Sequence, residues 1–142
     1  MDTLERFVTA QADSYPFALA ELRAGRKKSH WMWWIFPQLA GLGRSPTAQH
    51  YAIASADEAR AYLAHPLLGP RLFEAMSAVT GASGDAQQVL GAIDALKLRS
   101  SATLFGCVAD APEPFQAALA RHFGGEPDPE TLRLLGRINP AA

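Results

Sequence analysis

The chain has 142 residues, of which 49% are hydrophobic and 19% are charged, and its formal net charge is −1 at pH 7. This length and composition fit one globular domain that buries its own core without a metal ion or a disulfide. The near-zero charge provides no overall field for duplex nucleic acid, and a single cysteine excludes an intrachain disulfide.

Three features of the sequence predict a cytoplasmic protein. The first five residues include two acids, where a secretory signal needs basic residues. The longest dense apolar run, residues 31–36, is far too short to cross a bilayer, so no membrane association is expected. One cysteine also fits a reducing compartment.

Hydrophobic periodicity is helical along nearly the whole chain. Residues 4–11 carry a short first stripe, and a second helix is expected to start near Ser14, because Pro16 then stands in its first turn. Gly25 is the expected C-terminal cap of that second helix. Beyond the aromatic run, the glycines and proline of residues 41–46 indicate a loop.

Helix starts are marked more clearly in the second half of the chain. Ser55–Glu58 has the form of a capping box, and His65-Pro66 separates that helix from the next one. A short turn is expected at 85–90 and a helix at 114–123, and Asp128 is expected to cap a last helix.

The stretch 93–108 is the longest predicted helix. Its apolar residues do not keep to one face, which is typical of a helix packed on several sides. No segment shows the alternation of a strand. We therefore predict a single all-α domain over residues 1–142, with about six to eight short helices around a central apolar helix near 93–108.

The first group of candidate ligand-binding residues begins at a basic pair, Lys27-Lys28. Lys28 and His30 near a helix start are suited to hold an anion, with Trp31 or Trp34 as a stacking face. His30 is also a weak candidate for acid–base catalysis, because histidine titrates near working pH. The alternative interpretation is a solvated loop followed by core tryptophans.

A second group lies in the glycine loop. Gly41 and Gly43 allow close approach of the backbone to a ligand, and Arg44 beside Ser45 is suited to a phosphate. The spacing matches neither a dinucleotide-binding fingerprint nor a P-loop. The alternative is a two-glycine turn followed by a capping serine.

A third group comes from later helices. Lys97 and Ser101 share one face of the predicted central helix with Asp94. A partly buried Lys97 ammonium needs a partner, which is either Asp94 as a structural pair or a bound anion. Arg71 either points into the same cavity or stands at the surface of a helix corner. The histidines and the cysteine lack metal-ligand spacing, so no metal is expected, and no cofactor is identified.

Three segments resemble the signature of the domain of unknown function 1810 family. They are Lys28-Ser29-His30-Trp31-Met32-Trp33-Trp34-Ile35-Phe36-Pro37-Gln38-Leu39 with Gly41-Leu42-Gly43, the run 61–72, and the run 94–105. The similarity extends from about Leu4 to Leu135. It implies a compact all-α fold, and it implies no established activity and no catalytic residues.

These residues support three functional hypotheses. The preferred one is a pocket for a phosphorylated or nucleotide-like small molecule, which requires Lys28, His30 and Lys97 to converge. One alternative is a protein-interaction or adaptor module with an exposed patch of tryptophan and phenylalanine, for a protein partner that the sequence does not identify. The other is a single-stranded nucleic-acid binder, against which the near-neutral charge counts. Whether the chain is an enzyme stays open.

Overall fold

The computed structural model describes residues 4–138, and within them it is all-α. The elements in order are α1 (Glu5–Ala24), α2 (Met32–Ile35), α3 (Pro46–His50), α4 (Ala56–Ala64), α5 (Leu68–Thr80), α6 (Ala86–Leu90), α7 (Ala92–Val108), α8 (Glu113–Phe123) and α9 (Pro129–Ile138). The only strand-like feature in the described part is an isolated parallel bridge between Leu39 and Ile53. The predicted fold class is confirmed. The nine helices within 4–138 exceed the expected six to eight because α2, α3 and α6 are single turns.

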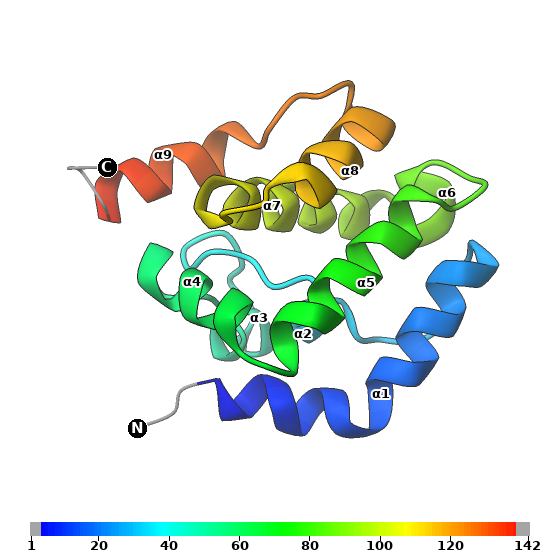
Figure 1. Ribbon diagram of the computed structural model, residues 1–142, viewed down its shortest axis with the longest axis horizontal. Helices are drawn as coiled ribbons and strands as arrows, with labels where there is room; N and C mark the ends of the chain where they lie inside the picture. Colours follow the sequence, from blue (N-terminus) through cyan, green and yellow to red (C-terminus); the bar gives the residue numbers. More distant parts are fainter. Residues whose placement is uncertain (1–3, 139–142) are drawn as a thin grey trace.

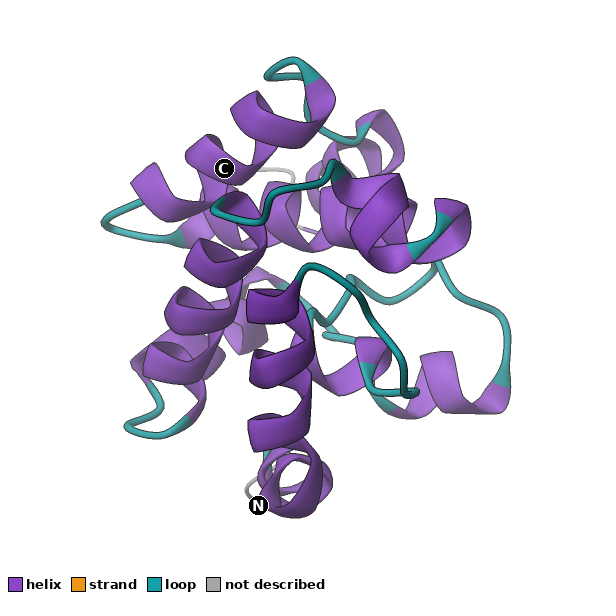
Figure 2. Ribbon diagram, turned by 90° about the vertical axis from the view of Figure 1, so that its right-hand side faces the viewer, coloured by secondary structure: helices purple, strands orange, loops and turns teal. Residues whose placement is uncertain are grey.

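The helix α7 is the centre of the fold. It packs against α4, α6, α8 and α9, and Figure 1 shows it between the α8–α9 side and the α1–α5 side of the molecule. Figure 2 shows the same packing from the side, with helices joined only by loops. Residues Ser100 to Phe105 are all buried, so the second half of α7 is enclosed as predicted.

The first half of α7 departs from that prediction. Ile93 and Leu96, expected to be core residues, are 74% and 63% exposed. Ile93 lines the candidate site described below, so this exposed part of α7 borders that site.

The N-terminal helix also differs from the prediction. One helix, α1, replaces the two expected on either side of Ser14, and Pro16 lies in its interior. Proline in a helix removes one hydrogen bond and bends the helix, and α1 is visibly bent in Figure 1. The two predicted stripes therefore lie on two arms of one bent helix, which ends at Gly25 as expected, with φ of 79°.

The helix caps read from the sequence are present. Ser55 Oγ accepts a hydrogen bond from the Glu58 N–H at 3.1 Å, and Asp128 accepts one from the Thr131 N–H at 3.1 Å. At the α4–α5 corner, His65 Nδ1 accepts from the N–H groups of Leu67 and Leu68. These side chains satisfy donors that a helix start leaves free.

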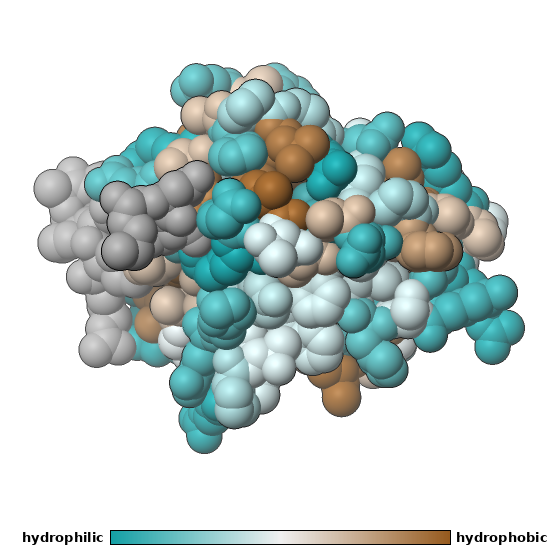
Figure 3. All heavy atoms as spheres, turned by 90° about the horizontal axis from the view of Figure 1, so that it is seen from below, coloured by the Kyte–Doolittle hydropathy of each residue, from teal (hydrophilic) through white to brown (hydrophobic). Residues whose placement is uncertain are grey.

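The surface is mixed. On the face in Figure 3, hydrophobic residues form separate patches among hydrophilic ones. In the part of the chain that the structure describes, no helix combines the length and the apolar character needed to cross a membrane.

Candidate functional site

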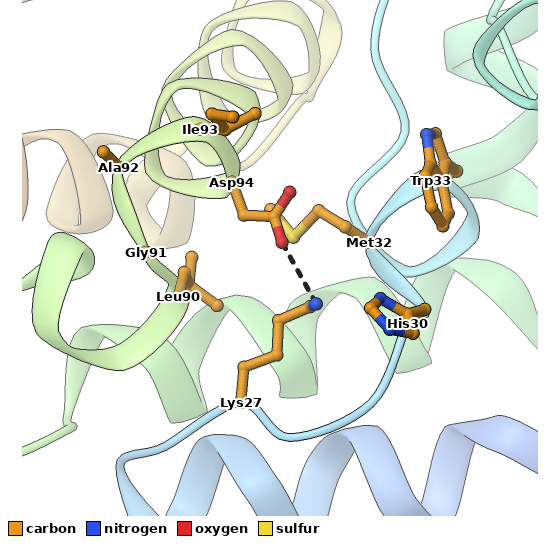
Figure 4. Close-up of a pocket in the computed structure, with 9 residues that line it drawn as sticks. All are labelled: Lys27, His30, Met32, Trp33, Leu90, Gly91, Ala92, Ile93 and Asp94. Atoms are coloured by element: carbon orange, nitrogen blue, oxygen red, sulfur yellow. Dashed lines mark ion pairs between the residues drawn. The ribbon is translucent and has the colours of Figure 1, made fainter. Parts of the chain in front are cut away.

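Two stretches distant in sequence meet around an open pocket of about 440 Å³. The first is the loop after α1 together with the start of α2, and the second is the end of α6 together with the start of α7. The lining residues, drawn in Figure 4, are Lys27, His30, Met32, Trp33, Leu90, Gly91, Ala92, Ile93 and Asp94.

A charged cluster stands at this pocket. Asp94 Oδ2 lies 3.0 Å from Lys27 Nζ, and Asp94 Oδ1 lies 3.4 Å from Lys97 Nζ. The side chains of Lys27, Asp94 and Lys97 are only 10%, 18% and 21% exposed. Since two ammonium groups share one carboxylate, the cluster keeps one positive charge in excess, in a place where water screens it incompletely.

Each of the two lysines of the cluster also lies over an aromatic ring. Lys97 Nζ lies 4.8 Å from the centre of the Trp33 ring, and Lys27 Nζ lies 5.3 Å from that of Trp31. Such cation–π contacts stabilise an ammonium group at a partly buried position. In Figure 4 His30 stands between Lys27 and Trp33 on the same side of the pocket.

The loop that carries Lys27 and His30 is held by Glu21 of α1. One Glu21 oxygen accepts from the N–H groups of Lys28 at 2.7 Å and Ser29 at 3.0 Å and from Trp31 Nε1 at 2.9 Å, and the other accepts from Ser29 Oγ. Desolvation alone would raise the pKa of Glu21, but these hydrogen bonds outweigh it and lower the pKa to about 2. Lys27 N–H also donates to the Val89 carbonyl at 2.8 Å, so the loop is tied at both ends.

The start of α7, from Gly91 to Asp94, lines the pocket. Gly91 precedes the helix with φ of 89°, a conformation that favours glycine, and no side chain caps α7. The first N–H bonded back to the preceding turn is that of Ala95, to the Gly91 carbonyl at 2.9 Å. The donors before it carry the partial positive charge of a helix N-terminus, which favours an anion.

Of the first group of predicted residues, only His30 lines the pocket. His30 lines the pocket, whereas Lys28 is exposed beside it and its N–H is bound to Glu21. Trp31 is 1% exposed and packs in the core. Trp34 donates from Nε1 to Ser14 Oγ at 2.7 Å and lies outside the pocket. The lysine and the tryptophan that line the pocket are therefore Lys27 and Trp33.

The glycine loop has mainly structural contacts. A Cβ at Gly43 would lie 2.4 Å from the Cβ of Ala48, so glycine is needed there for packing on α3. Ser45 caps α3 by accepting from the Ala48 N–H at 3.1 Å. Gly43 also lines a hollow next to the pocket, together with Lys97, while Gly41, Arg44 and Ser45 line neither one.

Two predicted residues lie elsewhere. The Arg71 guanidinium stacks 4.7 Å from the centre of the Tyr15 ring and donates to Gln11, between α1 and α5. Ser101 is fully buried inside the fold, and its Oγ has no hydrogen-bond partner among the described residues. The preferred hypothesis required Lys28, His30 and Lys97 to converge. His30 and Lys97 are both at the site, and the lysine that lies there with them is Lys27 and not Lys28.

The buried Ser101 hydroxyl leads to a stability prediction. Ser101→Ala removes an oxygen that satisfies no partner, so we expect unchanged or higher stability, by up to about 1 kcal/mol in chemical denaturation. The matched control is its neighbour Ser100, whose Oγ contacts the Leu96 carbonyl at 3.1 Å and Asp128 at 3.2 Å. Ser100→Ala should cost about 1 kcal/mol. Equal losses in both variants would contradict the assignment.

Among the described residues, no group of three His, Cys, Asp or Glu side chains is placed to hold a metal ion. The fold and the site define a small all-α protein with a basic and aromatic pocket at the start of its central helix.

The chain belongs to the family described as "Protein of unknown function (DUF1810)", which matches residues 1–135. This confirms the resemblance seen in the sequence. The crystal structure of the conserved hypothetical protein Rv1873 from Mycobacterium tuberculosis is 51% identical and superposes with a TM-score of 0.92, covering 94% of this chain and 96% of that chain. No curated protein matches the chain.

Proposed function

We propose that this protein binds a phosphorylated, nucleotide-like small molecule in the pocket at the start of α7. The observation that carries the proposal is the sharing of the single Asp94 carboxylate by Lys27 and Lys97, at 3.0 and 3.4 Å. A phosphate group at this point would balance the excess positive charge and accept hydrogen bonds from both ammonium groups.

The surroundings of the cluster support an organic phosphate. The uncapped N-terminus of α7 offers backbone donors beside Lys27, and His30 adds a ring nitrogen. Trp33 offers a partly exposed aromatic face for the remainder of the ligand. The pocket volume of about 440 Å³ falls within the range of small-molecule sites.

The two alternatives receive less support. A partner-binding patch of tryptophan and phenylalanine would have to be exposed, but Trp31 and Phe36 are buried and Trp33 and Trp34 are partly buried. A groove for single-stranded nucleic acid would need a continuous basic track. Acidic side chains, Asp94, Asp128 and Glu130, alternate with the basic ones along this face instead.

A thermal-shift screen with inorganic phosphate, nucleotides and phosphorylated metabolites tests the proposal. A ligand that binds only the folded state raises the unfolding midpoint. Lys97→Ala removes one charge-assisted contact, so the dissociation constant should rise about 10- to 100-fold.

The control is Lys28→Ala, which removes the same charge from an exposed side chain just outside the pocket. It should leave the dissociation constant within about threefold of wild type, because an exposed charge is well screened. If no phosphate compound shifts the midpoint of the wild type, the proposal fails. If Lys28→Ala and Lys97→Ala weaken binding equally, the site is elsewhere.

A further inference from the structure

A second hollow, of about 300 Å³, adjoins the pocket. Ile93 lines both of them. Lys97 lines the second hollow and also contacts Asp94 and Trp33, which line the first. The Lys97 ammonium therefore stands between the two, within reach of a ligand that occupies both.

The second hollow differs in chemistry from the first. Leu42, Ile93 and Leu96 form an apolar part of its lining, and the last two are the strongly exposed residues of α7. The rest of the lining is polar or charged and includes Arg99, Asp128 and Glu130. Exposed aliphatic side chains beside a hollow are suited to cover a flat apolar group. Gly43 lines the same hollow.

Gln38 is the amide side chain among the polar residues of this lining. Its backbone is fixed, because its carbonyl accepts from the Ile53 N–H at 2.8 Å. Its side-chain amide makes no hydrogen bond to any of residues 4–138, and Gln38 is one of the residues that line the second hollow. A glutamine amide offers a donor and an acceptor side by side, the pair that matches N6 and N7 of adenine.

We infer that the second hollow holds the adenine ring of a mononucleotide whose phosphate lies between Lys27 and Lys97. This inference rests on the proposed function and specifies its ligand. In this arrangement the adenine ring lies against Leu42 and Leu96, and the Gln38 amide hydrogen-bonds to the edge of the ring. The phosphate is bound by the charged cluster. The fold thus joins a phosphate subsite and a base subsite across one lysine.

Calorimetric titration of the full chain with AMP, CMP and inorganic phosphate tests the arrangement. We expect AMP to bind at least about tenfold more tightly than phosphate or CMP. Gln38→Ala should reduce the preference for AMP over phosphate about tenfold and leave phosphate binding unchanged, and the exposed Gln116→Ala on α8 should change neither.

Leu96→Glu provides a second variant that does not depend on the glutamine. Leu96 is exposed, so the change should not disturb folding, but it puts a carboxylate beside the base subsite. The loss of AMP binding should exceed the loss of phosphate binding about tenfold. If the wild type binds phosphate and AMP equally, or if both variants keep the preference, the base subsite is refuted while the phosphate site stands. If neither AMP nor phosphate binds, the proposed function fails with it.

Discussion

Gly69→Ala should be the most damaging single-methyl change in this protein, costing about 3 kcal/mol or preventing folding altogether. Gly69 lies in the first turn of α5, where the chain turns back against α4. A Cβ at this position would lie 2.1 Å from the Leu63 carbonyl oxygen, which is backbone and cannot move aside as a side chain can. Overpacking of a rigid contact costs about 1–3 kcal/mol, and more when backbone must shift. Urea denaturation measures the loss.

Gly136→Ala is the matched control for this prediction. Gly136 lies inside α9, and an added Cβ there meets nothing within 4 Å. Alanine should stabilise this helix by about 0.5–1 kcal/mol, because glycine loses more backbone entropy in a helix. A Gly69→Ala protein as stable as wild type would show that the α4–α5 corner is not packed as described.

Glu21→Ala should have the second largest effect, a loss of about 3 kcal/mol together with the loss of ligand binding. The change leaves the Trp31 indole N–H, the loop N–H groups and the Ser29 hydroxyl without their acceptor. Leaving a buried donor unsatisfied costs about 1–3 kcal/mol, and the exposed donors add less because water replaces the carboxylate. Because the same loop carries Lys27 and His30, the pocket should be disordered as well. Denaturation and thermal shift with AMP measure the two effects.

Glu21→Gln separates charge from shape and predicts a pH dependence. The pKa of Glu21 in the folded protein is about 2, below its ordinary value of 4.5, so the folded state favours the ionised form. Its contribution is therefore fully present above pH 4.5 and is lost as the pH falls toward 2. The stability difference between wild type and Glu21→Gln should be constant near neutral pH and shrink across this window. A difference independent of pH would contradict the proposed role of the carboxylate.

The features that could be predicted from the sequence are those set by neighbouring residues. Ser55 and Asp128 cap helices because the groups they bind lie three residues away. The all-α class follows from periodicity over many residues, which is a strong signal. Continuity of α1 through Pro16 could not be predicted, because packing of the two arms outweighs the local cost of proline in a helix.

The sequence singled out segments that border the pocket, but two of the side chains that line it, Lys27 and Trp33, were not among the candidate residues. Lys27 and Lys28 are equivalent by sequence, and which one faces Asp94 is decided by the anchoring of the loop to Glu21 and Val89. Trp33 and Trp34 are likewise adjacent on a single turn, so their directions depend on tertiary contacts. The excess positive charge of the cluster could not be predicted from the sequence. It arises because Lys27 and Lys97, seventy residues apart, contact the same carboxylate in the folded chain.

An NMR titration of the ¹⁵N-labelled protein with AMP tests the central claim most directly. If Lys27, Lys97 and the start of α7 form a phosphate site, saturable shifts should concentrate on the backbone amides of Gly91–Asp94 and the indole N–H of Trp33. The amides around Arg71 and Arg121, which lie outside this pocket, should stay unchanged and serve as an internal reference. Saturable shifts centred on Arg71 or Arg121, or none at millimolar AMP, would contradict the account.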